Sequence, residues 1–342
     1  MKLNIFVSFL LILVGGAVFA QAGELSLSPD KKTVVFEGKG KTILAAVDTG
    51  EVKKTLPGRS PKFLKDGRIV MWTAKKDEGA RVVVYSSKDG SLLKHEPFKN
   101  RVQKTGSINR SDPAWGMYWQ EDKLDEAVVG LWYTISPDEK YIAVGTDYYW
   151  GVFVFDINSG DQVFKFGVDT THAFNLKYSP DGKILAFSVK GDVGLYDAST
   201  GKKLMGVYNA DPLETFEFSP DGKLIATGHP DKIKIWDAAT GLPKASFPLV
   251  VGTPTSIHFS PDGKFIGVKG RKNGAEGGIA FYDLQGKLVK EFENNGLDHM
   301  YGDFVFMSDA EVTAISFDQG RGKMKKNAKI PNFAVERLVI QQ

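Results

Sequence analysis

The chain contains no cysteine among its 342 residues. This absence excludes disulfide bonds, thiol catalysis, cysteine-ligated zinc, covalently attached c-type haem and a lipidated N-terminal cysteine. An excess of charge of one sign is also missing, because 44 Lys and Arg residues face 41 Asp and Glu residues, for a formal net charge of +3. No basic stripe of the kind that binds nucleic acid is present, so we expect no nucleic-acid partner.

Long hydrophobic runs are absent after the first segment of the chain. Lys2 precedes an apolar run over residues 3–14, and small residues at 18–22 form a cleavage site. This pattern is typical of a secretory signal peptide, and no later run is apolar enough to span a bilayer. We therefore expect a signal peptide over residues 1–22, no membrane span, and one mature domain over residues 23–342. Because cysteine is also lacking, we predict a bacterial protein that is periplasmic or secreted.

Enzyme signatures are missing as well. There is no G-x-S-x-G, no glycine-rich phosphate loop that opens a helix, and no pair of carboxylates whose spacing indicates catalysis. The glycine-rich stretch 270–278 lies between two strand-like segments, so it is predicted to be a flexible loop rather than a phosphate site. We expect a protein with neither a catalytic set nor a cofactor.

What the chain does contain is an internal repeat with a period of about 40 residues. The turn sequence S-P-D-G occurs at 179–182, 219–222 and 260–263, and weaker copies begin at Ser28 and Ser136. Proline and glycine at these positions favour a tight turn in which the glycine is left-handed. Strand-like runs flank each turn and a second turn of the form D-x-x-T-G follows. Each repeat is therefore predicted to form four antiparallel strands.

The aspartate of the turn occurs once in each repeat, so its positions give the number of repeats. The interval between Asp66 and Asp138 is too long and indicates an insertion at 98–130; an eighth, cryptic repeat is the alternative. We expect an all-β, seven-bladed β-propeller of four-stranded antiparallel blades. Lys31 and Glu139 stand where the turn glycine belongs, so their turns are predicted to be less regular. The seven turn aspartates are Asp30, Asp66, Asp138, Asp181, Asp221, Asp262 and Asp309.

These repeats resemble the WD40 family and the related YVTN and quinoprotein-like propellers. The resemblance is clearest over residues 219–241, where Trp236-Asp237 stands in the place of the WD dipeptide. It implies that the two repeated turns lie on one rim and the variable loops on the opposite face. Ring closure implies that residues 25–27 lie against the C-terminal segment 333–340. The Gly-His pair expected before each turn is missing, so we expect apolar packing in the blades instead of a buried Asp-His network. The residues near its place are Asp169, Asn209 and Val250.

Aromatic residues gather on the predicted variable face. The insertion contains P-A-W-G-M-Y-W, and the third blade adds rings at its entry and in its loop. Flat amphipathic rings beside carboxylates suit a sugar, a peptide or a loop of a partner protein. The alternative is that they pack as a satellite core over their own blade. The candidate binding residues are Trp115, Tyr118, Trp119, Trp132, Tyr148, Tyr149 and Trp150.

Three histidines are candidates for a metal site on the same face. His172, His229 and His299 are predicted to lie in loops, with aspartates nearby in the sequence. Imidazole and carboxylate groups can hold a metal ion. However, the loops belong to blades that do not all adjoin, and no H-x-H or H-E-x-x-H spacing is present, so we expect solvated loop residues and no metal. His258 alternates into a predicted strand and is expected to pack rather than to catalyse.

Two functions remain open for such a propeller. The first is an exported, non-catalytic scaffold that binds through its variable face, with another envelope or secreted protein as the preferred partner and a carbohydrate or peptide as the alternative. The second is a periplasmic enzyme, or a redox or metal-binding protein of the quinoprotein or lactonase type, that uses the mouth of the central channel. The lack of a catalytic set favours the first. A stoichiometric metal or a visible absorption band would favour the second.

Overall fold

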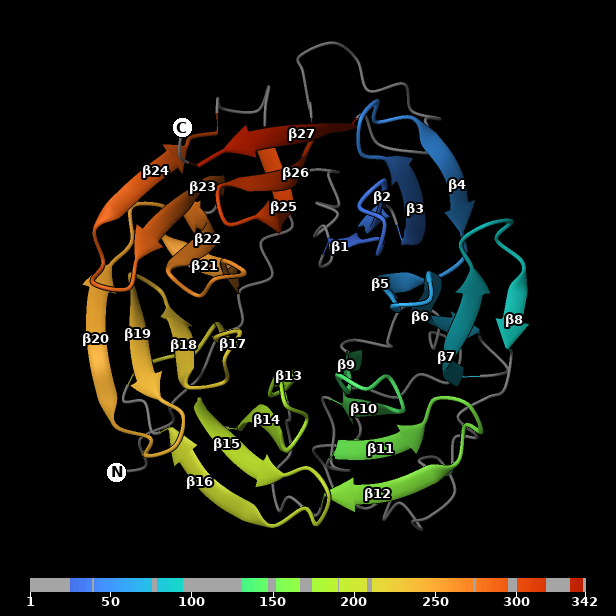
Figure 1. The fold of residues 1–342 in the computed structure, drawn as a ribbon, viewed down its shortest axis with the longest axis horizontal. Helices are drawn as coiled ribbons and strands as arrows, with labels where there is room; N and C mark the ends of the chain where they lie inside the picture. Colours follow the sequence, from blue (N-terminus) through green and yellow to red (C-terminus); the bar gives the residue numbers. More distant parts are fainter. Residues whose placement is uncertain are drawn as a thin grey trace, which may run out of the picture.

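Seven antiparallel sheets surround a common axis as blades, in the order in which they occur along the chain (Figure 1). The prediction of an all-β, seven-bladed propeller is therefore confirmed. The predicted signal peptide and the predicted insertion at 98–130 lie outside the described residues. The computed structural model describes residues 25–38, 40–75, 79–94, 131–146, 152–166, 174–189, 191–207, 211–272, 275–294, 300–317 and 333–340.

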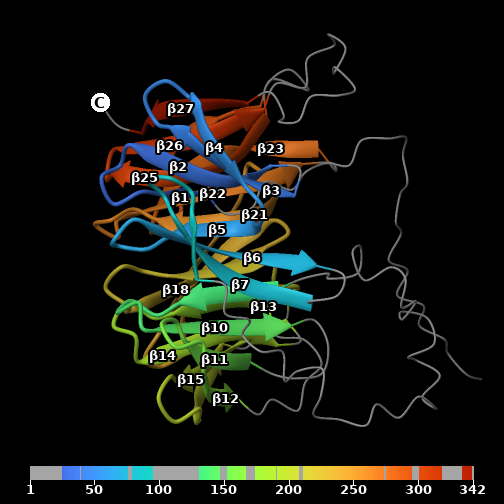
Figure 2. The same cartoon turned by 90° about the vertical axis from the view of Figure 1, so that its right-hand side faces the viewer.

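Each blade uses consecutive strands, with the first strand nearest the axis and the last at the periphery (Figure 1). Seen edge-on, inner strands such as β10 and β13 cross the thickness of the ring from one face to the other (Figure 2). Blade 1 contains β1 (Ser26–Leu27), β2 (Thr33–Gly38), β3 (Lys41–Ala46) and β4 (Val52–Leu56); blade 2 contains β5 (Arg59–Phe63), β6 (Arg68–Lys75), β7 (Gly79–Ser86) and β8 (Leu92–Lys94); blade 3 contains β9 (Leu131–Ile135), β10 (Tyr141–Thr146), β11 (Val152–Asp156) and β12 (Gln162–Phe166).

The remaining blades follow the same plan until the last, which has three strands in the described residues. Blade 4 contains β13 (Phe174–Tyr178), β14 (Ile184–Val189), β15 (Asp192–Asp197) and β16 (Lys203–Val207); blade 5 contains β17 (Thr215–Phe218), β18 (Leu224–His229), β19 (Lys232–Asp237) and β20 (Pro243–Pro248); blade 6 contains β21 (Thr253–Phe259), β22 (Phe265–Lys272), β23 (Ala275–Asp283) and β24 (Leu288–Phe292); blade 7 contains β25 (Met300–Ser308), β26 (Glu311–Phe317) and β27 (Phe333–Val339).

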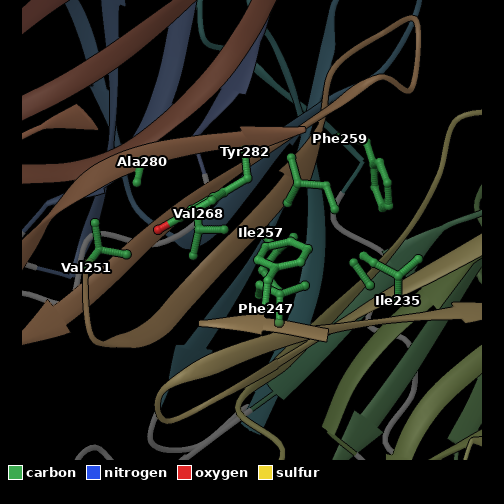
Figure 3. Close-up of a cluster of buried hydrophobic side chains, with 11 residues drawn as sticks. Ile235, Phe247, Val251, Ile257, Phe259, Val268, Ala280 and Tyr282 are labelled. Atoms are coloured by element: carbon green, nitrogen blue, oxygen red, sulfur yellow. The ribbon is translucent and has the colours of Figure 1, made fainter. Parts of the chain in front are cut away.

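Apolar clusters hold neighbouring blades together. Between blades 5 and 6, Ile235 and Phe247 from one blade meet Val251, Ile257 and Tyr282 from the other (Figure 3). Because each sheet has a neighbour on both faces, its middle strands are apolar on both sides instead of alternating with polar residues. The expectation that apolar packing stabilises these blades is confirmed.

The turn between the first and second strands has the same geometry in the first six blades. The residue at the glycine position donates its N–H to the carbonyl three residues earlier and has a positive φ. Gly222 has φ 70°, as predicted for a left-handed glycine. The prediction of less regular turns at Lys31 and Glu139 is wrong, because these residues adopt φ values of 57° and 58°.

Contacts with the preceding blade explain why two side chains are tolerated there. Glu139 Oε1 accepts the backbone N–H of Lys65 at 2.7 Å, and Lys31 Nζ donates to the carbonyl of Met307 at 2.6 Å. Lys65 stands at the proline position of the blade 2 turn, where proline would have no N–H to donate. These bonds offset the left-handed strain, which is about 1–2 kcal/mol per residue.

Glycine instead occupies the position where the preceding turn supplies a proline. A Cβ added to the glycine would lie 3.4–3.6 Å from the Cδ of that proline, so the two turns already touch. Adjacent turns are therefore joined in two ways. In one, a proline of the preceding turn meets a glycine of the following turn; in the other, a backbone N–H of the preceding turn donates to a carboxylate of the following turn. The proline–glycine pairs are Pro137 with Gly182, Pro180 with Gly222, and Pro220 with Gly263.

Blade 7 closes the ring against blade 1. Phe36 meets Phe333 edge-on at 4.9 Å between ring centroids, and Leu25 belongs to the same apolar cluster, against which Phe333 and Val335 pack. The predicted contact between residues 25–27 and the C-terminal segment is confirmed. The last blade also reaches the first through a buried carboxylate, because Asp303 Oδ2 accepts the N–H of Leu25 at 2.8 Å.

Candidate binding face

Consecutive antiparallel strands place the connections of every blade alternately at its two ends. We call the end with the first–second and third–fourth connections the turn rim. The end with the second–third connections and the links between blades is the loop face. The turn rim is uniform, because the turn serine donates to the turn aspartate at 2.6–2.7 Å and accepts the N–H five residues later in five blades. The loop face varies in the length of its second–third connections. The connection at 230–231 has two residues, whereas the one at 318–332 has fifteen.

Of the aromatic candidates, Trp132 alone lies in the described part of the chain. It belongs to β9, is half-buried, and packs against the apolar cluster between blades 3 and 4. The structure therefore gives Trp132 a packing role at this boundary. The other candidates, which lie outside the described residues, are Trp115, Tyr118, Trp119, Tyr148, Tyr149 and Trp150.

A group of polar and aromatic side chains from blades 1 and 2 lies on the loop face. We call Glu37, Arg59, Ser60 and Trp72 the Arg59–Trp72 cluster. The Arg59 guanidinium lies 5.6 Å from the centre of the Trp72 ring, close enough for a cation–π contact. Its Nε lies 3.7 Å from Glu37, and half of the Arg59 side chain is exposed. Arg59 therefore presents a positive charge to solvent on an aromatic support.

Ser60 holds this cluster together from a strained backbone. Its φ is 48°, which is uncommon for a residue other than glycine. Its N–H donates to Glu37 Oε2 at 3.2 Å, and its hydroxyl accepts the indole N–H of Trp72 at 3.3 Å. The hydroxyl of Tyr133 lies between the carbonyls of Ser60 and Val70, 3.1 Å from the latter.

Burial raises the pKa of Glu37, while the Ser60 N–H and Arg59 oppose this shift. The carboxylate thus lies in a partly desolvated place, where its charge depends on these two partners. Sequence reasoning missed the Arg59–Trp72 cluster, because its residues come from three strands of two blades and belong to no repeated motif. Strain at Ser60 follows from the tertiary contacts and has no signal in the sequence.

A second cluster lies on the loop face at the boundary between blades 4 and 5. Lys232 and Lys234 of β19 approach Asp211 at 3.2 and 2.8 Å, and the ammonium of Lys234 also lies 5.8 Å from the centre of the Trp236 ring. Hydrogen bonds from Lys234 and Lys232 lower the pKa of Asp211 to about 2. The Lys232 and Lys234 side chains are 31 % and 19 % exposed, against 50 % for Arg59, so this part of the face presents less charge to solvent.

His229 lies at the end of β18 and is fully buried. Its Nδ1 is 2.8 Å from the carbonyl of Pro212, which can only accept, so Nδ1 carries the proton. Its Nε2 is 2.9 Å from the hydroxyl of Thr227, which in turn accepts the indole N–H of Trp236 at 2.8 Å. Both imidazole nitrogens are therefore occupied within the protein, and burial lowers the pKa of His229.

The other two histidine candidates, His172 and His299, lie outside the described residues. Within the described ranges, no three His, Cys, Asp or Glu side chains are grouped in a way that could hold a metal ion. The same part of the chain contains no helix long and apolar enough to cross a membrane.

Polar side chains also recur around the axis of the ring. In blades 1 to 6, the first strand carries a polar residue two positions before the first residue of the turn. Where a contact is resolved, this residue reaches the next blade. Thus Ser26 Oγ accepts the N–H of Phe63 at 3.0 Å, and Lys177 pairs with Glu217 at 2.9 Å. The six residues are Ser26, Lys62, Thr134, Lys177, Glu217 and His258.

His258, the polar residue of blade 6 near the axis, takes part in the closure of the ring. His258 Nε2 lies 3.7 Å from Asp303 Oδ1, and the His258 ring meets Phe304 edge-on at 5.0 Å. Burial alone would lower the pKa of His258, but the Asp303 carboxylate outweighs it and raises this pKa. Asp303 Oδ1 also accepts the hydroxyl of Ser256 at 2.8 Å. The expectation that His258 packs in a strand is confirmed, and Asp303 joins blades 6, 7 and 1.

A comparison with protein families identifies the repeat. A family described as the WD domain, G-beta repeat, matches residues 203–237. The matched segment runs from the start of β16 to the end of β19, which is the fourth strand of one blade and three strands of the next. One repeat of this propeller is of the WD40 type. A search of curated proteins finds none that matches the chain. In this WD40-like propeller, the matched repeat contains the series of hydrogen bonds that links Trp236, Thr227 and His229. This series ends at the backbone carbonyl of Pro212 instead of at an aspartate.

Proposed function

We propose that this WD40-like propeller is an exported, non-catalytic scaffold that binds another protein through its loop face. The contrast between the two ends of the ring carries the proposal. On the turn rim, the turn side chains bond to their own blade or to the preceding one, as Asp309 does when it accepts the N–H of Asp262 at 2.8 Å. The loop face has variable connections, and these are the positions where binding residues gather on a rigid scaffold.

The Arg59–Trp72 cluster is the proposed centre of this binding face. Arginine and tryptophan are enriched among the residues that dominate binding energy in protein interfaces. The Trp72 ring restricts the motion of the Arg59 guanidinium, so little side-chain entropy is lost when a partner binds Arg59. A partner with a carboxylate or an aromatic ring at the contact would suit this charge. The candidate aromatic residues Trp119 and Trp150 are proposed to extend the same face.

Residues 1–22 and the lack of cysteine support the proposed export. Mass spectrometry of the protein from a bacterial envelope fraction tests it directly. We expect a mature N-terminus between Gln21 and Gly23. Retention of Met1 in a cytoplasmic fraction would contradict export without affecting the proposed binding role.

Affinity capture from the envelope fraction tests the binding face. We compare the wild type with R59E on the loop face and with K223E on the turn rim, which is a matched charge reversal of an exposed residue. We expect R59E to weaken capture of the same partner by about 30-fold, the loss expected for a 2 kcal/mol hot spot, and K223E to leave it unchanged.

Trp119→Ala and Trp150→Ala extend this test to the aromatic residues. If they form part of the binding face, each should weaken capture with little change in melting temperature. If instead both variants lose about 3–5 kcal/mol of stability, these rings are core and the binding face does not include them. Equal loss of capture in R59E and K223E would overturn the loop face as the site.

A further inference from the structure

Blade 7 differs from the other six in what covers its third strand. In blades 1 to 6, a fourth strand pairs with the third, whereas β27 is the last strand of its sheet in the described residues. Its pairing with β26 runs from Phe333 to Val339 without interruption. By contrast, every third–fourth pair in the other blades carries a register shift. β27 is thus a third strand by its pairing, and no described strand pairs with its outer edge.

Burial of the third strands agrees with this assignment. The third strands β3, β11, β15 and β19 have no exposed residue other than Lys41 at the start of β3, because a fourth strand lies outside each of them. β27 leaves Ala334, Arg337 and Val339 exposed, and Val339 keeps 45 % of its surface. The outer part of β27 therefore has the accessibility of a strand whose neighbour is missing.

The edge of β27 also differs from the other outer strands in its charged residues, because it has an exposed arginine in place of the lysines. Exposed lysines on a sheet edge oppose pairing with another strand, because pairing would desolvate the ammonium group. β27 has no lysine, and its only cation, Arg337, is bound by both carboxylate oxygens of Glu311, at 2.6 Å for the Nη2 bond. The exposed lysines on outer strands elsewhere are Lys53, Lys54, Lys165, Lys203, Lys244 and Lys290.

We propose that the outer edge of β27 binds an extended segment of another protein as a fourth, antiparallel strand, with an aromatic residue followed by lysine in the segment. This surface is separate from the loop face and does not depend on the function proposed above. Strand addition is an established mode of peptide recognition, in which main-chain hydrogen bonds supply affinity and side-chain pairs supply specificity.

The fourth strands of the complete blades indicate which residues the partner segment should contain. In blade 3, Phe164 and Lys165 of the fourth strand lie opposite Val154 and Phe153 of the third. Counted from the turn, the matching positions in blade 7 are Arg337 and Glu336. An aromatic ring opposite Arg337 allows a cation–π contact while Glu311 still holds the guanidinium. A lysine opposite Glu336 adds a cross-strand pair of opposite charge to a carboxylate that also accepts the hydroxyl of Ser316.

The adjacent blade limits the length of this surface. In blade 1, Gly50 lies in the turn between the third and fourth strands, and a Cβ added to it would lie 3.7 Å from the backbone nitrogen of Val335. The open edge therefore runs from Glu336 to Val339. A short fourth strand is sufficient there, since β12 pairs with β11 through four residue pairs.

A synthetic peptide tests the proposal on the mature protein. Its sequence copies residues 161–166 of blade 3, Asp-Gln-Val-Phe-Lys-Phe, with an added N-terminal cysteine. Because the protein has no cysteine, Val339→Cys introduces a single thiol at the edge. Leu204→Cys is the matched control, since Leu204 is equally exposed on an outer strand of a complete blade. Antiparallel binding brings the peptide thiol to Val339→Cys.

We expect disulfide formation with Val339→Cys to be at least about tenfold faster than with Leu204→Cys, because bound peptide raises the local thiol concentration. A peptide with its cysteine at the C-terminus should lose this advantage. Replacing the peptide lysine by glutamate should weaken binding by about fivefold, from the loss of one cross-strand pair and the gain of repulsion. N-methylation of alternate peptide nitrogens should abolish binding.

Three outcomes would overturn the proposal. Equal rates with the two cysteine variants would show that the peptide does not select β27. No saturable binding to the wild type would show that the edge is closed, for instance by another segment of this chain. A concentration-dependent dimer that is lost in Val339→Lys would identify a second copy, rather than another protein, as the occupant.

Discussion

At the scale of single residues, the buried hydrogen bonds of blade 5 depend on one hydroxyl. Thr227 accepts from Trp236 and donates to His229, so its side chain satisfies a donor and an acceptor at once. Thr227→Val keeps the shape but leaves both groups without a partner. We expect a loss of about 1–3 kcal/mol in the free energy of unfolding, measured by urea denaturation.

Trp236→Phe provides the control for this prediction. It removes the indole N–H that Thr227 accepts. If the chain of hydrogen bonds acts as a unit, the double variant should be less destabilised than the sum of the two single variants. Strict additivity would show that the three groups contribute independently.

The two described histidines should respond to pH in opposite directions. The Asp303 carboxylate raises the pKa of His258 above 6.5, so the stability from this pair is fully present below pH 6.5 and is lost as pH rises through the folded-state pKa. Burial lowers the pKa of His229, so its contribution is present above pH 6.5 and is lost as pH falls through the lower folded-state value.

His258→Gln isolates one of these contributions. We expect its cost in unfolding free energy to be greatest below pH 6.5 and to shrink as the pH is raised above the pKa of His258. Urea denaturation of the variant and the wild type between pH 5 and pH 9 checks this. A cost that is independent of pH would mean that His258 acts only through packing against Phe304.

At the scale of elements, the turns show how adjacent blades are coupled. The boundary between blades 2 and 3 uses Lys65 N–H and Glu139, whereas the boundary between blades 3 and 4 uses Pro137 and Gly182. Lys65→Pro alone should destabilise the protein, because the Glu139 carboxylate loses its donor. Adding Glu139→Gly should recover stability, because it recreates a proline–glycine pair and removes the left-handed strain.

A double-mutant cycle on these two positions measures the coupling. We expect an interaction free energy of at least about 0.5 kcal/mol in favour of the double variant, from urea denaturation of the four proteins. Lys183→Ala, on the exposed turn of blade 4, serves as a control that should couple to neither. Additive effects of Lys65→Pro and Glu139→Gly would contradict the proposed link between the turns.

The same turns show what the sequence could predict and where it failed. Ser, Pro, Asp and Gly at fixed spacing act locally, so the turns, their strands and the number of blades could be predicted from the repeat. The error at Lys31 and Glu139 arose because the contacts that offset their strain come from the preceding blade. Local chemistry alone predicts a distorted turn at these positions, while the structure keeps the regular one.

The candidate site was harder to predict for the same reason. His229 was predicted to lie in a loop, but strand register aligns it with Thr227 and buries it. The Arg59–Trp72 cluster was missed, because Arg59 and Trp72 meet through the register of β5 and β6, and Glu37 joins them only when blades 1 and 2 pack. The proposed roles of Trp119 and Trp150 stay predictions.

At the scale of the whole molecule, the last strand of the chain seals the boundary with the first blade. Deleting residues 333–342 removes Phe333 from the ring of Phe36 and exposes both the cluster around Leu25 and the edge of β26. We expect the truncated protein to aggregate and to melt at a lower temperature.

Light scattering after size-exclusion chromatography, together with thermal melting, measures this effect. Deletion of residues 341–342 alone is the control, since it leaves the whole of β27 in place. A truncated protein that stays monodisperse and melts like the wild type would contradict the role of β27 in closure.

The bond from Leu25 to Asp303 has a consequence for the order of folding. Its two partners are separated by 278 positions in the chain, whereas the strands within each blade pair with near neighbours in sequence. Closing so long a loop costs entropy that is recovered only when the last blade forms. Blades 2 to 6 can therefore assemble early during synthesis. Blade 1, however, keeps one apolar face uncovered until the C-terminal residues have been synthesised. This interval is when the chain is most exposed to aggregation, and the rate of joining its two ends should limit the yield of native protein.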